Sequence, residues 1–430
     1  MLLKEGMVRF WRWPERRTDL SARLHRFAVA ALPIVAFLAL VPPAMAQSQG
    51  KNAQEAGATV ILIGYLARQE DPRTPLSFLE PVATDEGLQG ARLALADNNT
   101  TGAFLKQSYR LVEQTLPQDG DIATGVKALA DEGVRFVVAD LPADALLVAA
   151  GLPEAKSMLL FNARAADDAL RNEQCRTNIL HTAPSRRMLA DALAQYLAWK
   201  KWTRWSLLTG RDPGDALYAE AVRRAAKRFG GRIVDEKSWT FDTGNRRTDT
   251  GVTTIQSDIP LATQGADYDV LVVADEAGDF GDYLDGRTWY PRPVAGTQGL
   301  TATAWSRVNE QWGGTQLQSR FEKLAGRWMT PRDYAAWLAV RSIGEAAART
   351  NAAGFDDLSA YLHSPDFELA GFKGEALSFR AWDGQMRQPI LIAGPRMLVS
   401  VSPQEGFLHP VTPLDTLGDD APESKCRLNR

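Results

Sequence analysis

Polar and charged side chains follow several expected strands, at the points where the chain turns toward the next helix. Ligands of open α/β sheets bind at the carboxyl ends of the strands, so these side chains are candidates for holding a ligand. The amide hydrogens and the dipole at the start of each following helix also attract anions. The candidate ligand-binding residues are Arg68, Arg73, Asp140, Asn162, Tyr218, Asp275 and Glu276.

No pattern in the sequence indicates catalysis. The chain lacks a G-x-S-x-G elbow, an HExxH motif, a P-loop and a GxGxxG motif after a strand. His181 has no nucleophile near it in sequence, which favours a structural role. We therefore expect a protein that is not an enzyme and has no cofactor.

An acidic segment, "DEAGDFGDYLD" (residues 275–285), raises the question of a metal site. Clustered carboxylates suit hard cations, but the spacing and the final Glu of an EF-hand are missing. The two cysteines and four histidines show no zinc-ligand spacing. A solvated acidic loop is the favoured interpretation, and no metal site is predicted.

The elements that must position these residues alternate between strand and helix. The expected strands cover residues 59–66, 108–116, 134–141 and 157–163, then 204–210, 232–239, 268–274 and 292–300. The expected helices cover residues 85–99, 121–132, 142–155, 185–202, 214–231 and 330–350, with a hairpin turn at Asp383-Gly384. Continuous apolar strands separated by helices predict an α/β protein with two doubly wound parallel-sheet lobes.

The N-terminus has the pattern of a signal peptide. A region rich in arginine precedes an apolar run, "FAVAALPIVAFLALV", and then small residues at Ala44 and Ala46. We expect cleavage after residue 46 and export to a bacterial periplasm. An uncleaved membrane anchor and a twin-arginine signal at Arg16-Arg17 are the alternatives.

Cysteine content and charge restrict the classes of protein further. Cys175 and Cys426 are the two cysteines, and in an oxidising compartment they are expected to form a disulfide. Two independent thiols are the alternative. The net charge of −3 and the pI near 5.9 argue against a nucleic-acid partner, because a basic footprint is missing.

The order of several motifs resembles the type I periplasmic solute-binding proteins of ABC importers, and in particular the branched-chain amino acid receptors. These motifs are a strand "VILIGYL", a helix ending in "LADNN", "TAPS" before a long helix, "YDVLVVA", "YAAWLAVRSIGEAA" and a closing "FRAWDGQMRQPILI". More narrowly, "EDPRTPLSFLEPVATDEGLQGARLALADNN" and "RPVAGTQGL" resemble the substrate-binding component associated with PQQ-dependent alcohol dehydrogenase systems.

The resemblance implies two lobes, joined by three crossovers, that close on a small-molecule solute and dock on an ABC permease in the inner membrane. A monomer is expected. The lobes would comprise residues 58–182 plus 303–368 and residues 183–302 plus 369–410, followed by a C-terminal tail at 411–430. The alternative function is an accessory receptor or carrier, for a cofactor or a metal, in a PQQ-dependent alcohol oxidation system.

The resemblance also sets expectations for the ligand. The family's amino-acid receptors hold the ligand carboxylate with hydroxyls and amides of the first lobe, and its ammonium with an acid of the second. Asp140 stands where a Ser/Thr-rich turn is expected and would repel a carboxylate, whereas Asp275 or Glu276 matches the second-lobe acid. The loop from Arg68 to Thr84 is expected to form a wall of the cleft, with a lid packed on its own lobe as the alternative.

Overall fold

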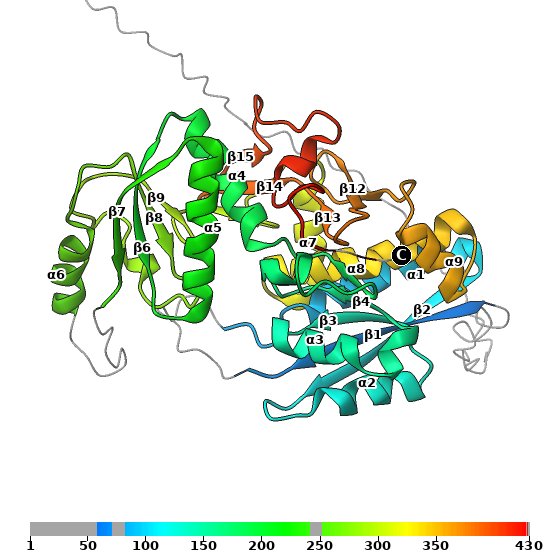
Figure 1. The fold of residues 1–430 in the computed structure, drawn as a ribbon. Coiled ribbons are helices and arrows are strands. Elements are labelled where there is room, and N and C mark those ends of the chain that lie inside the picture. The colour runs from blue at the N-terminus through cyan, green and yellow to red at the C-terminus, as the bar shows by residue number, and fades with distance from the viewer. Residues whose placement is uncertain (1–57, 71–81, 241–251, 427, 429–430) are drawn as a thin grey trace, which may run out of the picture. The chain divides into compact units, whose positions relative to one another are not determined.

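The computed structural model describes residues 58–70, 82–240, 252–426 and 428. The predicted signal peptide (residues 1–46) and Arg73 lie outside the described residues. None of the described helices is long and apolar enough to cross a membrane. Two large sheets and the helices packed on them make up an α/β fold, which confirms the predicted class (Figure 1).

The first sheet contains five parallel strands in the order β2-β1-β3-β4-β5. These strands are β1 (Thr59–Arg68), β2 (Gln107–Leu116), β3 (Phe136–Asp140), β4 (Leu159–Asn162) and β5 (Ile179–His181). Its helices are α1 (Leu88–Leu105), α2 (Ile122–Asp131), α3 (Ala143–Gly151), α7 (Gly314–Ala325), α8 (Pro331–Thr350) and α9 (Phe355–Leu362). Strand β3 is buried throughout, because α1 and α8 cover one face of the sheet and α2 and α3 cover the other (Figure 1).

Helix α1 differs from its predicted span of residues 85–99. It begins at Leu88 and continues to Leu105, past the Asp-Asn-Asn sequence that was expected to end it. Asn98 donates from its side chain to the carbonyl of Val340 at 2.8 Å, and Asn99 bonds to both backbone groups of Tyr109. These tertiary bonds occupy the side chains that would otherwise compete with the helix backbone.

The second sheet has seven strands in the order β15-β14-β10-β9-β8-β6-β7. These are β6 (Arg204–Thr209), β7 (Arg232–Ser238), β8 (Val270–Ala274), β9 (Val294–Gly296), β10 (Leu300–Thr303), β14 (Ile390–Ala393) and β15 (Leu398–Ser402), with helices α4 (Arg186–Trp199), α5 (Pro213–Phe229) and α6 (Val252–Thr263). The sheet is mixed, not purely parallel as expected: β14 and β15 run antiparallel to their neighbours. They form a hairpin, so no crossover helix is needed between them.

A small third sheet, within residues 369–387, packs against the hydrophobic cluster that the first sheet shares with α1 and α8. It consists of β11 (Leu369–Ala370), β12 (Ala376–Phe379) and β13 (Met386–Arg387), and its β12–β13 pair surrounds the predicted Asp383-Gly384 turn. The buried side chains of Leu377, Phe379 and Met386 belong to the same hydrophobic cluster as those of α1 and α8. We therefore propose that residues 369–387, assigned above to the second lobe, are part of the first.

Helices α1 and α8 approach each other closely at Gly90. A Cβ atom at this position would lie 1.9 Å from the carbonyl oxygen of Asp333, so only glycine fits. Helix α8 begins at Pro331, next to the predicted start at residue 330, with Thr330 as its N-cap. Thr330 and Asp333 form a capping box, which fixes the helix start beside the strand ends.

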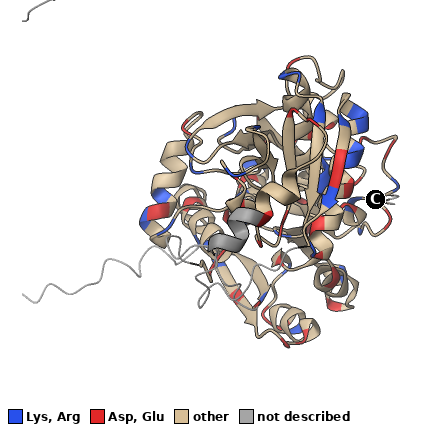
Figure 2. Ribbon diagram, turned by 90° about the vertical axis from the view of Figure 1, so that its left-hand side faces the viewer, with Lys and Arg blue, Asp and Glu red and all other residues tan. Residues whose placement is uncertain are grey.

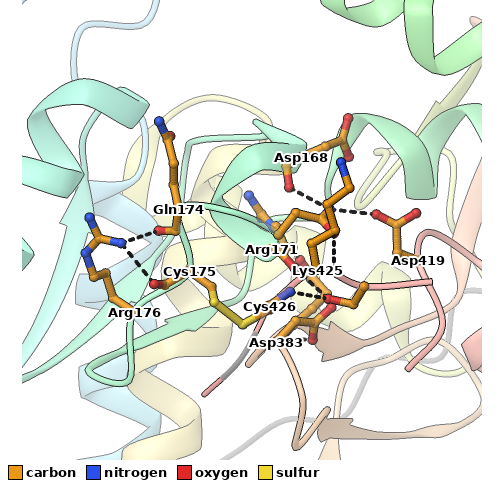
Figure 3. The surroundings of a disulfide bond; sticks show 12 residues. Asp168, Arg171, Gln174, Cys175, Arg176, Asp383, Asp419, Lys425 and Cys426 are labelled. Carbon is orange, nitrogen blue, oxygen red and sulfur yellow. Dashed lines mark hydrogen bonds between the residues drawn. A yellow bond between two sulfur atoms is a disulfide. The ribbon is translucent and has the colours of Figure 1, made fainter. Parts of the chain in front are cut away.

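Cys175 and Cys426 form the predicted disulfide (Figure 3). The disulfide joins the C-terminal tail to the segment that follows the 3₁₀ helix η2 (Asp168–Arg171). The described residues also form the 3₁₀ helices η1 (Glu154–Ser157), η3 (Gly281–Tyr283) and η4 (Pro413–Thr416). The side chain of Asp419 accepts hydrogen bonds from Asn172, which follows η2, at 2.7 Å and from Arg224 of α5 at 2.8 Å. The tail therefore contacts segments that belong to the surroundings of both large sheets, since η2 precedes β5 and α5 follows β6.

Basic residues of α5 pair with acids. Arg223 pairs with Glu236, and Arg224 and Arg228 each pair with Glu423. Figure 2 shows basic and acidic residues interspersed over the ribbon. The arginines of this helix thus form a charge-paired face.

Candidate ligand-binding cleft

A cleft of about 880 Å³ lies where the carboxyl ends of the strands in the two large sheets face each other. Its first wall comes from the loops after β3 and β4 and from the start of α8. Its second wall comes from the loops after β8 and β9 and from α4 and α5. The volume is within the range of about 300–1,000 Å³ that is usual for small-molecule pockets.

Two guanidinium groups, those of Arg164 and Arg332, line the first wall. Arg332 lies 3.7 Å from the carboxylate of Glu86 and 3.7 Å from that of Asp140. Arg164 forms an ion pair with Glu70. Burial, followed by the positive charges of Arg332 and Arg68, lowers the pKa of Arg164 to about 10. Neighbouring acids therefore compensate the positive charge at Arg164 only in part.

Helix α3 starts in the same wall. Its N-cap is Pro142, which offers no side-chain acceptor to the amide hydrogens of the first turn. Asp144 is the acid in this turn, and it is exposed. The free amides and the positive end of the helix dipole add to the attraction that the arginines exert on an anion.

Arg186, in the first turn of α4, connects acids from both walls. Its Nε and Nη2 donate to the carboxylate of Glu276 at 2.9 and 2.7 Å. Its Nη1 lies 3.2 Å from Asp167, which follows β4. Burial raises the pKa of Glu276, and the nearby Arg186 opposes that shift. Glu276 thus lines the cleft, but it is already paired with a cation.

Asp275 also lines the cleft, yet its carboxylate turns into the protein. It accepts hydrogen bonds from the backbone amides of Asp279, Phe280 and Gly281 at 2.8, 2.9 and 2.7 Å. The side chain is fully buried. Asp275 therefore shapes the acidic segment, and among the described residues no group of three or more His, Cys, Asp or Glu is arranged to hold a metal ion.

Asp140 and Asn162 lie behind the first wall. Asp140 accepts a hydrogen bond from the Tyr65 hydroxyl at 2.7 Å, and burial raises its pKa to about 6. The side chain of Asn162 accepts from the backbone amide of Ala165 at 2.8 Å and contacts Nδ1 of His181 at 2.9 Å. Asn162 thereby holds the turn that presents Arg164, and His181 supports it from a buried position.

Two further predicted residues occupy different places. Tyr218 lines the cleft from α5 and is 3% exposed. Arg68, at the end of β1, lines a neighbouring cavity of about 370 Å³ together with Arg164. Residues 71–81 of the loop from Arg68 to Thr84 lie outside the described residues. The predicted role of this loop as a wall of the cleft therefore stays a proposal.

Sequence reasoning missed Arg164, Arg186 and Arg332 as cleft residues. Arg186 and Arg332 each occupy the first turn of a helix, where the dipole disfavours a positive charge. A cation at that position is a signal that a nearby acid or a ligand compensates it. Arg164 follows β4 within a loop that the sequence did single out, although Asn162 was chosen there.

Comparison with known proteins relates this geometry to a family. Residues 82–280 match the family model described as periplasmic binding protein. No curated protein sequence matches the chain significantly.

Solved structures show the same fold across most of the chain. A branched chain amino acid ABC transporter periplasmic ligand-binding protein from Burkholderia xenovorans is 15% identical, with a TM-score of 0.65, 86% of this chain and 100% of that one covered. An ABC transporter substrate-binding protein from Sphaerobacter thermophilus is 18% identical, with a TM-score of 0.62 and 84% and 100% coverage.

A third solved structure contains a ligand. It is a solute binding protein of an ABC transporter from Rhodopseudomonas palustris in complex with 3,4-dihydroxy benzoic acid, with 15% identity, a TM-score of 0.55 and 78% and 93% coverage. The solved structures therefore show that the chain has the type I periplasmic binding protein fold, and the family match over residues 82–280 agrees with this fold.

Proposed function

We propose that this protein is the substrate-binding component of an ABC importer. It would capture a small solute in the cleft between its lobes and deliver it to a permease in the inner membrane. The observation that carries the proposal is the cleft itself, because loops at the strand ends of both large sheets line it. The family match over residues 82–280 and the fold of the neighbours support the same function.

The arrangement suggests how binding would be transmitted to a partner. A solute that contacts both walls stabilises the closed arrangement, because it gains its full set of contacts only when the lobes meet. The chain passes between the two sheets before α4, after β10 and between β13 and β14, and these connections are the natural hinges. The protein would act as a monomer in the periplasm, after export through its signal peptide, and would release its solute unchanged.

Native mass spectrometry of the mature protein, purified gently from a periplasmic extract of its own host, tests this function. We expect one small organic molecule per chain, and we expect the radius of gyration in small-angle X-ray scattering to fall when the purified solute is added back to stripped protein. A protein that carries no solute, and whose scattering and thermal stability do not respond to any fraction of the extract, would refute the proposal. A bound mass equal to that of PQQ would favour the accessory role in alcohol oxidation instead.

A further inference from the structure

The charge arrangement of the cleft points to a class of solute. We propose that the solute is an organic acid without an ammonium group beside its carboxylate, and that Arg164 and Arg332 hold the carboxylate. This inference rests on the function proposed above and narrows it. It differs from the expectation of an amino-acid ligand that the family resemblance carries.

The first wall contains guanidinium donors that are available to an anion. Arg332 has its two acid neighbours at 3.7 Å, and within the described residues its guanidinium donates no hydrogen bond. The side chain of Arg164 is 15% exposed, whereas the side chain of its partner Glu70 is 53% exposed, so a ligand can displace that partner readily. Planar guanidinium groups bind carboxylates through two parallel hydrogen bonds, which an ammonium group cannot do.

The electrostatics of the first wall agree with this geometry. The lowered pKa of Arg164 shows that its protonated form is destabilised by burial and by two neighbouring arginines. An anion bound between Arg164 and Arg332 would offset both effects. The uncapped start of α3, in the same wall, favours negative charge as well.

Among the described residues, both acids of the second wall already have hydrogen-bond donors as partners. All of the Asp275 carboxylate's contacts described above are backbone amides, and both oxygens of Glu276 accept from Arg186. An ammonium group would enter this wall without a free carboxylate, and burying such a charge unpaired is costly. The uncharged side chains of Leu189 and Tyr218, which also line the cleft, suit a hydrocarbon or aromatic body.

Asp167 and Asp144 are the remaining acids of the lining. Asp167 lies 3.2 Å from the guanidinium of Arg186 and is therefore already paired with a cation. Asp144 lies on the first wall, in the first turn of α3, and it is exposed. The helix dipole already stabilises its charge, and it lies on the wall that carries the arginines. The D144N substitution separates the role of Asp144 from the roles of Arg164 and Arg332.

The experiment compares ligands that differ only in the amine. Stripped protein is titrated calorimetrically with 3-phenylpropionate and phenylalanine, with 4-methylpentanoate and leucine, and with 3,4-dihydroxybenzoate. In parallel, anionic, zwitterionic and neutral pools of a periplasmic extract are tested for their effect on thermal stability. We expect the anionic pool to stabilise the protein, and the acid of each responding pair to bind at least tenfold more tightly than its amino acid.

Single substitutions test whether Arg164 and Arg332 hold the carboxylate. R164M and R332M should each weaken binding of the acid by about tenfold or more, and R332K should lie between wild type and R332M, because it keeps the charge but loses the planar pair of donors. R110M, which replaces an exposed arginine of β2, is the matched control and should bind the acid as tightly as wild type does. D144N should leave the preference for acids over amino acids unchanged.

The outcomes separate this inference from the function on which it rests. Stabilisation by the zwitterionic or neutral pool alone, or tighter binding of the amino acids, would overturn the organic-acid inference and leave the receptor function intact. A loss of amino-acid binding in D144N would also overturn the organic-acid inference and leave the receptor function intact, because it would show that Asp144 holds an ammonium group. If no pool changes the thermal stability, both the receptor function and its proposed solute class fail.

Discussion

Replacing Asp140 by asparagine should stabilise the protein at pH 8 and have little effect at low pH. The carboxyl group is buried, its Oδ2 accepts from Tyr65, and its Oδ1 has no hydrogen-bond partner among the described residues. Burial raises its pKa from 3.8 to about 6 in the folded protein, even though Arg332 and Tyr65 act in the opposite direction. The native state therefore binds this proton more tightly than the unfolded chain does.

The size and sign of the effect follow from linkage. A group whose pKa is raised on folding stabilises the protein at low pH and loses that contribution as the pH rises through its folded pKa. A shift from 3.8 to about 6 corresponds to about 3 kcal/mol, of which about 2 kcal/mol is lost between pH 4.5 and pH 8. Asparagine has the shape of the neutral acid and does not titrate, so D140N should keep this stability.

Urea unfolding followed by circular dichroism measures this difference directly. The free energy of unfolding of D140N minus that of wild type should increase by about 2 kcal/mol from pH 4.5 to pH 8. D144N, which removes an exposed carboxylate that the dipole of α3 stabilises, is the control, and its difference should not increase with pH. A difference for D140N that does not change with pH would refute the reasoning. Because Arg332 loses an acidic neighbour, D140N should also bind an organic acid more tightly at pH 8.

Three other changes test the fold. C426S removes the bond to Cys175 that closes a loop of 251 residues, so it should lower the free energy of unfolding by up to about 5 kcal/mol; its thermal unfolding should match that of reduced wild type and differ from that of the oxidised protein. G90A would force α1 away from the Asp333 carbonyl and should cost about 1–3 kcal/mol or more; an unchanged melting temperature would contradict the packing. R186Q leaves its acid partners without a cation and should destabilise the protein by about 3 kcal/mol at pH 8 but less at pH 5, as measured by urea unfolding.

The sequence by itself determined the α/β class, most of the elements and the disulfide. Local signals are strong for these features: "VILIGYL" and "YDVLVVA" are continuous apolar runs, and Thr330-Pro331 marks a helix start. The pairing of Cys175 with Cys426 followed from their number, since the chain has no other cysteine. Each of these features depends on short-range pattern or on composition.

Only the tertiary structure decided what the candidate site residues do. Asp275 and Glu276 are neighbours of the same charge type in sequence, yet the chain folds so that amide hydrogens surround the first and Arg186 pairs with the second. Arg332 reaches the cleft from a helix that begins about 190 residues after Asp140, which lies 3.7 Å from it. Charge compensation depends on distances between residues that are far apart in the chain, and no local pattern encodes those distances.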